Sequence, residues 1–360
     1  MGKLINGQWV SSEEQTRIGD KGSSSENPSE QGSARSVVGG GTRGDSFPAG
    51  GGLGIDLPKK NGDFVRGVTS FRNWIGSDPF PAEAGRYHLL VAHNCPWAHR
   101  TVIVRNLKGL RDVIGMSVAH YRRNEDGWWF PEGLDEFQPT EGKLPLHEFY
   151  ARAEGEYTGS ATVPVLWDRQ RKTIVSNESA EIIQMLNSEF ADFGATPIDL
   201  YPDRLKSEID EVNEWVYQTI NNGVYKCGFA RTQEAYERAF VPLFASLDKV
   251  EARLDRHRYL VGDQLTLADV RLFTTLARFD AVYHGHFKCN LRRIVDYPNM
   301  WAYLRDLVQT EGIGETVQLE IYKKGYYGRS PGINPRGIVP LGPAIDFLAP
   351  HDRASRAYVT

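Results

Sequence analysis

The apolar positions of the chain change their period part-way along its length. In the first half they form short runs of strand length, at residues 86–92, 113–119, 163–168 and 172–175. Two helical patterns are interleaved with these runs. One covers residues 96–107, and the other begins at Asn177 with Ile182, Ile183 and Leu186 on one face. The short polar turn at 168–171 predicts that the last two strands form a hairpin.

The order of these segments predicts the fold of the first half. A strand, a helix and a strand are followed by a long aromatic loop at 120–160, then by two strands and a helix. This is the order of a thioredoxin-like domain, which we expect over residues 61–196. A loop as long as 120–160 in a compact domain is usually functional.

From residue 197 the apolar spacing is helical throughout. Two series recur at this spacing: Leu205, Ile209, Val212, Val216 and Ile220, and Ala239, Leu243, Leu247, Val250 and Leu254. Thr266 with Asp269 predicts a capping box at the start of a buried helix, and Pro298 opens another helix. We therefore expect an α/β half joined to an all-α half, with an all-helical domain at 197–325 and an extended tail at 326–360.

Composition limits what the remaining segments do. Residues 11–55 are rich in Gly, Ser, Glu and Arg and cannot bury enough apolar area to offset ordering, so 1–60 is predicted to be a flexible or draped arm. The net charge of −4 gives no pull toward nucleic acid or an anionic membrane. No apolar run reaches the roughly 18–20 residues of a membrane span. Three cysteines in 360 residues imply no disulfide framework, which favours a cytoplasmic location.

Cys95 carries the strongest chemical signal. It follows the strand pattern and precedes Pro96, and proline is favoured at the first position of a helix. Free backbone N–H groups and the helix dipole stabilise a thiolate at such a position. A lone cysteine is more often a buried apolar residue, but the strand–Cys-Pro–helix context favours a nucleophile. Ala98 stands where a second cysteine would resolve a mixed disulfide, so we expect an external thiol to release it.

Two segments near this cysteine are candidates for binding that thiol. Most X–Pro bonds are trans, yet Val163-Pro164 begins the third strand, where a cis proline faces the active cysteine of a thioredoxin-like domain; we predict cis. Glu178 and Ser179 open the next helix. They either cap it or bind the ammonium and carboxylate groups of a ligand.

Aromatic residues supply the remaining candidates. Trp128 and Trp129 are adjacent in the polar loop, so they point in different directions and one can face the site. Tyr225 and the pair Tyr326-Tyr327 lie at helix breaks, which suit residues that project into a cleft, although most buried tyrosines are packing residues. Histidines lack paired metal-ligand spacing apart from His284-Gly285-His286 beside Cys289, and no Gly-rich run has the context of a nucleotide loop. We expect no metal and no permanently bound cofactor.

Several separated motifs together resemble the glutathionyl-hydroquinone reductases, the xi class of glutathione transferases, from about residue 64 to 343. They are Ser70-Phe71-Arg72-Asn73-Trp74-Ile75, Asn94-Cys95-Pro96-Trp97-Ala98-His99-Arg100-Thr101, Asn221-Asn222-Gly223-Val224-Tyr225-Lys226, Tyr326-Tyr327-Gly328, Ile333-Asn334-Pro335 and Ile338-Val339-Pro340. The family often has Ser-His after its Tyr-Tyr-x pattern, whereas this chain has Arg329-Ser330. The resemblance implies a thioredoxin-like domain, an all-helical glutathione-transferase domain and a homodimer formed through the helical domains.

The resemblance also implies a role for each matching residue. Cys95 corresponds to the nucleophile and Tyr225 to the proton donor. Trp128, Val163, Pro164, Glu178 and Ser179 correspond to glutathione contacts. Tyr283 and Tyr326, with Tyr327 beside them, correspond to tyrosines that help hold the thiolate and line the quinone pocket.

Three functional hypotheses follow. The leading one is removal of glutathione from glutathionyl-hydroquinones through a Cys95 mixed disulfide, with glutathione or a related γ-glutamyl thiol as co-substrate. An omega-type thioltransferase or dehydroascorbate reductase shares Cys95 but needs no proton donor for a ring. A non-catalytic binding module would need neither residue. The expected partners are an aromatic small molecule and a low-molecular-weight thiol, with no nucleic acid and no membrane.

Overall fold

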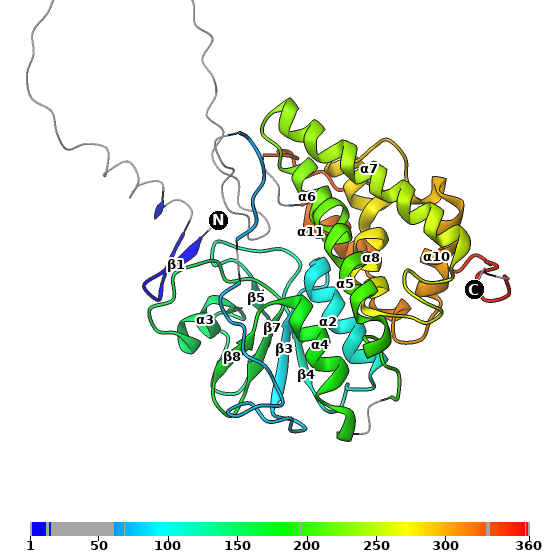
Figure 1. Cartoon of the computed structure of the whole chain (residues 1–360). Helices are drawn as coiled ribbons and strands as arrows, with labels where there is room; N and C mark the ends of the chain where they lie inside the picture. Colours follow the sequence, from blue (N-terminus) through cyan, green and yellow to red (C-terminus); the bar gives the residue numbers. More distant parts are fainter. Residues whose placement is uncertain are drawn as a thin grey trace, which may run out of the picture.

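The computed structural model describes residues 2–11, 14–15, 61–67, 69–193, 196–328, 332–356 and 358. Most of the predicted arm and Arg329 lie outside the described residues. The described chain has two halves packed side by side, one built on a sheet and the other made of helices (Figure 1). Among the described residues, no helix has the length and apolar character needed to cross a bilayer.

A mixed four-stranded sheet forms the centre of the first half. Its strands are β3 (Tyr87–Val91), β4 (Gly115–Val118), β7 (Val165–Asp168) and β8 (Thr173–Ser176). They lie in the order β4-β3-β7-β8; β3 and β4 are parallel, and the other neighbours are antiparallel. The predicted strands are confirmed, with ends that differ by one or two residues from those predicted. All five residues of β3 are buried, as its uninterrupted apolar run requires.

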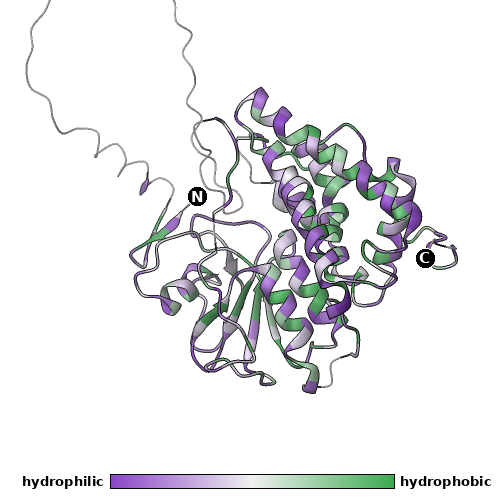
Figure 2. Ribbon diagram, in the orientation of Figure 1, coloured by the Kyte–Doolittle hydropathy of each residue, from purple (hydrophilic) through white to green (hydrophobic). Residues whose placement is uncertain are grey.

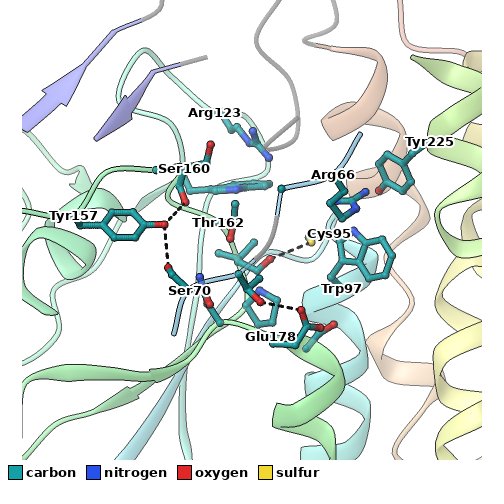
Figure 3. A pocket seen from close by; sticks show the side chains of 18 of the residues that line it. Arg66, Ser70, Cys95, Trp97, Arg123, Tyr157, Ser160, Thr162, Glu178 and Tyr225 are labelled. Carbon is teal, nitrogen blue, oxygen red and sulfur yellow. Dashed lines mark hydrogen bonds between the residues drawn. The ribbon is translucent and has the colours of Figure 1, made fainter. Parts of the chain in front are cut away.

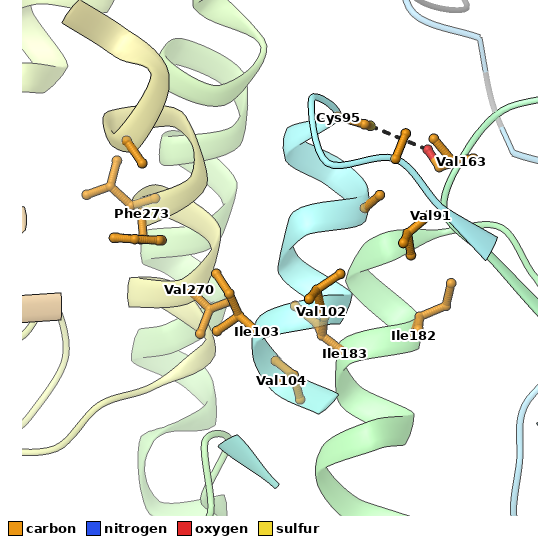
Figure 4. Packing of buried hydrophobic residues seen from close by; sticks show 14 of the residues in the cluster. Val91, Cys95, Val102, Ile103, Val104, Val163, Ile182, Ile183, Val270 and Phe273 are labelled. Atoms are coloured by element: carbon orange, nitrogen blue, oxygen red, sulfur yellow. Dashed lines mark hydrogen bonds between the residues drawn. The ribbon is translucent and has the colours of Figure 1, made fainter. Parts of the chain in front are cut away.

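Two helices pack together between this sheet and the helical half. They are α2 (Pro96–Leu107) and α4 (Ser179–Ser188); α2 begins where the sequence predicts, and α4 begins two residues after the predicted Asn177. Helix α2 contacts α4 on one side and the helical half on the other, so Val102 lies toward Ile183 and Ile103 toward Val270 (Figure 4). The apolar residues at successive positions of α2 are needed because the helix is covered on both sides.

The segment 120–160 has more regular structure than the sequence predicted. It contains the paired strands β5 (Trp129–Phe130) and β6 (Leu144–Pro145) and the helix α3 (His147–Ala153). The prediction of an irregular loop was therefore wrong in part. Strands of two residues and a helix of seven are too short to produce a periodic apolar pattern.

The first residues form a hairpin that the sequence analysis did not predict. Strands β1 (Lys3–Ile5) and β2 (Gln8–Val10) pair through a turn at Asn6-Gly7, where both residues have positive φ. Asn-Gly between short apolar strands is a strong hairpin signal. Leu4 is fully buried and exchanges two backbone hydrogen bonds with Gly159, of 2.9 and 3.0 Å. The hairpin is thereby fixed to the sheet half.

The second half is helical in its described residues. Its helices are α5 (Lys206–Val216), α6 (Gly223–Gly228), α7 (Gln233–Arg256), α8 (Leu267–Arg278), α9 (His284–His286), α10 (Pro298–Val308) and α11 (Leu319–Tyr327). Wide π-helical turns at Tyr217–Asn221 and Phe279–Tyr283 precede α6 and α9, and single 3-10 turns lie at Ala191–Phe193, Asp203–Leu205, Ile294–Asp296 and Gly314–Thr316. The predicted capping box of Thr266 and Asp269 is confirmed. Polar and apolar residues alternate along α7, whereas the central strands are mostly apolar (Figure 2).

Beyond α11, the described residues 332–356 contain no helix or strand. The tail was predicted from residue 326, whereas α11 continues to Tyr327. Arg353 fixes the end of the tail, since its buried guanidinium donates to the carbonyl oxygens of Leu254, His257 and Arg258, each at 2.6 Å.

Candidate active site

A cavity of about 310 Å³ lies where the two halves meet. The sheet half supplies most of its lining, and Tyr217 and Tyr225 come from the helical half. The lining includes Cys95, Trp128, Val163, Pro164, Glu178, Ser179 and Tyr225. The structure therefore brings together, in one cavity, residues that are far apart in the sequence, such as Cys95 and Tyr225.

Cys95 is the N-cap residue of α2, as the sequence predicted, with Pro96 at the first helical position. Its side chain is 6% exposed and forms part of the cavity wall. The thiol donates to the carbonyl oxygen of Val163, 3.6 Å away (Figure 4). The low exposure of Cys95 is compatible with its place in the cavity wall, because its sulfur faces the cavity rather than the outer surface.

The segment opposite Cys95 has the predicted backbone conformation. The Val163–Pro164 peptide bond is cis. Both residues line the cavity, directly before β7. The prediction made for this bond is therefore confirmed, and the Val163 carbonyl faces the sulfur.

Glu178 and Ser179 lie at the start of α4, and Glu178 is already engaged there. One carboxylate oxygen accepts a hydrogen bond from the Ala180 N–H at 3.0 Å, and the other accepts from the Thr69 hydroxyl at 3.1 Å. Glu178 thus caps the helix, one of the two roles left open by the sequence. Ser179 is buried and accepts from Arg100 at 3.4 Å. Both residues line the cavity, so capping does not remove them from it.

The adjacent tryptophans of the 120–160 segment point to different environments. Trp128 is 2% exposed and lines the cavity, with the guanidinium carbon of Arg123 4.1 Å from its ring centre. Trp129 stacks on His120 at 4.4 Å and donates to the Arg122 carbonyl at 2.9 Å. Trp128 is therefore the one of the pair that faces the site.

Tyr225 projects from α6, immediately after a π-helical turn. Its hydroxyl lies 2.6 Å from that of Tyr326, which lies 3.1 Å from the hydroxyl of Tyr283. Burial raises the pKa of Tyr225, a nearby Cys95 thiolate raises it further, and the Arg66 cation lowers it. The phenol is therefore protonated at neutral pH and is suited to donate a proton.

The other predicted tyrosines do not line the cavity. Tyr283 and Tyr326 lie behind Tyr225 and contact its hydroxyl group directly or through one another. Tyr327 is half-buried elsewhere, with its ring 4.5 Å from that of His286. Consecutive residues of a helix point about 100° apart, so Tyr326 and Tyr327 cannot both face Tyr225. The structure leaves Tyr283, Tyr326 and Tyr327 out of the cavity wall, and their role in holding the thiolate or the quinone stays a prediction.

Sequence reasoning missed the charged and aromatic residues around Trp97. The guanidinium carbons of Arg66 and Arg100 lie 4.6 and 4.5 Å from the centre of its ring. Arg100 donates to the side-chain oxygen of Asn221 at 2.9 Å, and Arg66 donates to that of Asn222 at 3.2 Å. The adjacent Asn221 and Asn222 could have indicated these contacts, because buried side-chain amides need hydrogen-bond partners.

The remaining cysteines lie apart from the cavity. Cys227 and Cys289 are both buried in the helical half and free, and neither lines the cavity. Burial raises the pKa of Cys289, and its contact with Cys227 adds to this effect. Among the residues that the structure describes, no group of three or more His, Cys, Asp or Glu side chains is placed to hold a metal ion.

Comparisons with known proteins agree with this geometry. Family models for the N-terminal and C-terminal domains of glutathione S-transferases match residues 94–189 and 233–306. The glutathionyl-hydroquinone reductase PcpF of Sphingobium chlorophenolicum is 50% identical over 290 residues, which cover 80% of this chain and 92% of PcpF. The chain belongs to the glutathionyl-hydroquinone reductases, the xi class of glutathione transferases.

Solved xi-class structures have the same fold as this chain. The glutathione-bound structure of YqjG from Escherichia coli K-12 has a TM-score of 0.76 and 48% identity, covering 80% of this chain and 97% of YqjG. The glutathione S-transferase Xi of Phanerochaete chrysosporium has a TM-score of 0.76 and 47% identity, covering 82% and 97%. These xi-class proteins are spanned almost completely, while about a fifth of this chain lies outside the alignments.

Proposed function

We propose that this xi-class chain uses Cys95 to remove glutathione from glutathionyl-hydroquinones, giving hydroquinone and glutathione disulfide. The observation that carries the proposal is the arrangement of Cys95 and Tyr225 in one cavity wall. A sulfur nucleophile at a helix N-terminus and a protonated phenol are the two groups that breaking a carbon–sulfur bond in this way requires.

The peptide part of the substrate fits the sheet side of the cavity. The Val163 backbone can pair with a peptide-like thiol, and the positive end of the α4 dipole, together with Ser179, suits a carboxylate. Glu178 suits an ammonium group, and Trp128 offers an apolar face. These features support a γ-glutamyl thiol as co-substrate, and glutathione is the thiol bound by the similar Escherichia coli protein.

The chemistry divides into two steps. First, the ring carbon that bears the sulfur takes a proton from Tyr225, and the Cys95 thiolate attacks the glutathionyl sulfur, so that the sulfur–sulfur bond forms as the carbon–sulfur bond breaks. Hydroquinone leaves, and Cys95 is left in a mixed disulfide. Second, another glutathione thiolate attacks this disulfide and releases glutathione disulfide and the Cys95 thiolate. Tyr225 lines the cavity and regains its proton from solvent there.

The tyrosine cluster favours this reaction over an omega-type thioltransferase or dehydroascorbate reductase. Exchange between thiols and disulfides needs no acid aimed at a ring carbon, yet Tyr225 is held beside Cys95 with its hydroxyl bonded to Tyr326. Comparing turnover of glutathionyl-hydroquinones with that of mixed disulfides and dehydroascorbate separates the two functions. Faster turnover of the ring substrates supports the proposal, and turnover of disulfides alone contradicts it.

Product analysis tests the overall reaction. The purified protein, supplied with a glutathionyl-hydroquinone and glutathione, is expected to release hydroquinone and glutathione disulfide in equal amounts. Cys95→Ala removes the nucleophile and is expected to abolish both products, whereas Cys227→Ala, away from the cavity, is expected to leave them unchanged. Product formation by Cys95→Ala at the wild-type rate contradicts the proposal.

The proposal also covers the oligomeric state of the chain and its location in the cell. We expect a homodimer formed through the helical half, where Val241 and Leu291 are 66% and 57% exposed. Size-exclusion chromatography with light scattering measures the molar mass and so tests this expectation. A cytoplasmic location is supported by the three free cysteines. The domain limits at residues 60, 196 and 325 remain predictions.

A further inference from the structure

Arg66 occupies the same corner of the cavity as the reacting groups. It lines the cavity from the segment 61–67, and its guanidinium carbon lies 4.6 Å from the Trp97 ring centre and 4.9 Å from that of Tyr225. Figure 3 shows these three side chains together beside Cys95. A permanent cation is therefore placed next to both the nucleophile and the proton donor.

The guanidinium of Arg66 is held by one hydrogen bond, and one of its other donor groups is unpaired. Its Nε donates to the Asn222 side chain, while Nη2 is buried without a hydrogen-bond partner among the described residues. A buried donor left unpaired costs free energy, most of all on a charged group. An anionic oxygen bound in the cavity would remove this cost.

Arg100 provides an internal comparison, because it also stacks on Trp97. Its side chain is 1% exposed and donates to Asn221 and Ser179, and its Nε also has no hydrogen-bond partner among the described residues, but Arg100 does not line the cavity. Arg100 therefore serves the packing of the two halves. Of the two guanidinium groups on Trp97, Arg66 is the one that a bound aromatic molecule can reach.

We propose that Arg66 binds the ring oxygen next to the sulfur-bearing carbon of the substrate, as the phenolate anion. This assignment rests on the function proposed above. The phenolate electron pair moves into the ring while the sulfur-bearing carbon takes the Tyr225 proton, which gives a ketone. Cys95 then attacks the glutathionyl sulfur, and the electron pair of the breaking carbon–sulfur bond restores the aromatic ring and returns the negative charge to the oxygen beside Arg66. The two sulfurs are oxidised to a disulfide as the ring carbon is reduced, and the Tyr225 anion takes a proton from solvent.

If Arg66 binds the phenolate, its contribution to the rate should depend on how acidic the phenol of the substrate is. The Arg66→Gln variant is given glutathionyl-hydroquinones whose ring carries zero, one, two or three chlorine atoms. The quantity measured is the rate at which the Cys95 mixed disulfide forms. For the unsubstituted ring we expect this rate to fall about 10²-fold, which is the usual effect of removing one hydrogen-bond donor from an oxyanion site. The loss is expected to shrink with each chlorine, because chlorine stabilises the phenolate without Arg66. An equal loss for every ring, or no loss, overturns the proposal.

Two controls separate this inference from the proposed function. Glutathione 2-hydroxyethyl disulfide has no ring oxygen, so its reaction with Cys95 is expected to slow far less in Arg66→Gln than the reaction of the unsubstituted ring does; a loss of rate as large as that for the rings overturns the Arg66 assignment. Arg122→Gln removes the same charge from an exposed side chain outside the cavity and is expected to behave as wild type. Failure of the wild-type protein with every ring substrate contradicts the proposed function itself.

Discussion

The hydroxyl groups of Tyr225 and Tyr326 lie 2.6 Å apart, and both side chains are about 1% exposed. In such a dry environment a hydrogen bond between two phenols fixes the direction in which Tyr225 presents its oxygen. Tyr326 and, behind it, Tyr283 form a short chain of hydroxyl groups. This chain holds the Tyr225 hydroxyl in place for the reaction.

Tyr225→Phe is predicted to slow formation of the Cys95 mixed disulfide from a glutathionyl-hydroquinone by about 10²-fold or more, the usual contribution of a general acid. Release of glutathione from that disulfide is expected to be unchanged, because the second step needs no ring protonation. Rapid mixing followed by acid quench measures each step. Equal slowing of both steps would remove Tyr225 from the role of acid.

Neighbouring tyrosines of α11 give a matched pair of variants. Tyr326→Phe removes the hydroxyl that contacts Tyr225 and is expected to slow the first step, although less than Tyr225→Phe does. Tyr327→Phe changes the next residue, which faces His286, and is expected to have no effect. Identical rates for the two variants would show that the hydroxyl chain has no part in the reaction.

Ser179→Ala is predicted to raise the KM for glutathione about tenfold, since hydrogen bonds to charged groups are worth about 1.5–3 kcal/mol. The rate at saturating glutathione is expected to stay near that of the wild type. Ser188→Ala, at the exposed end of the same helix, is the control. Steady-state kinetics with varied glutathione distinguishes them, and an unchanged KM in Ser179→Ala argues against a carboxylate site at the start of α4.

Asn221→Ala is predicted to lower the free energy of unfolding by about 3 kcal/mol, because it leaves the buried Arg100 guanidinium without its main partner. The amide of Asn221 accepts from Arg100 and donates to Thr275 and the Arg271 carbonyl, so it also joins the two halves. Urea unfolding measures the change. Asn106→Ala, at a half-buried site, is expected to cost much less, and equal losses would contradict the account.

Stability is predicted to fall as the pH drops below neutrality. Burial lowers the pKa of His88 and of His286 from 6.5 to about 4. Between these values the unfolded chain binds protons that the folded chain does not, so each histidine removes about 2 kcal/mol of stability at pH 5. Urea unfolding at pH 7 and pH 5 tests this, with His88→Gln expected to reduce the difference. A free energy of unfolding that is equal at both pH values would contradict it.

Local sequence signals predicted the frame of the active site well. Pro96 and the apolar runs on either side of Cys95 placed the sulfur at the start of α2 because proline and helix capping act within a few residues. The same holds for Thr266 with Asp269. The hairpin turn at Asn6-Gly7 carried an equally local signal, but its strands are only three residues long.

The contacts that complete the site were not predictable in this way. Arg66 meets Asn222 across 156 positions, and the segment around Arg66 has no period that would place it. Tyr326 and Tyr327 look equivalent in sequence, and only the packing of α11 decides which one faces Tyr225. The wide π-helical turn at Tyr217–Asn221, which sets the position of Tyr225, has no recognisable pattern of its own.

The most direct test of the central claim is the mass of the intact protein after a single turnover. Wild-type protein, mixed with an equal amount of a glutathionyl-hydroquinone and no free thiol, is expected to gain one glutathionyl group, mapped by peptide digestion to Cys95, as hydroquinone appears. Added glutathione is expected to return the protein to its starting mass. Release of hydroquinone without any adduct on Cys95, or an adduct on Cys227 or Cys289 instead, would contradict the account.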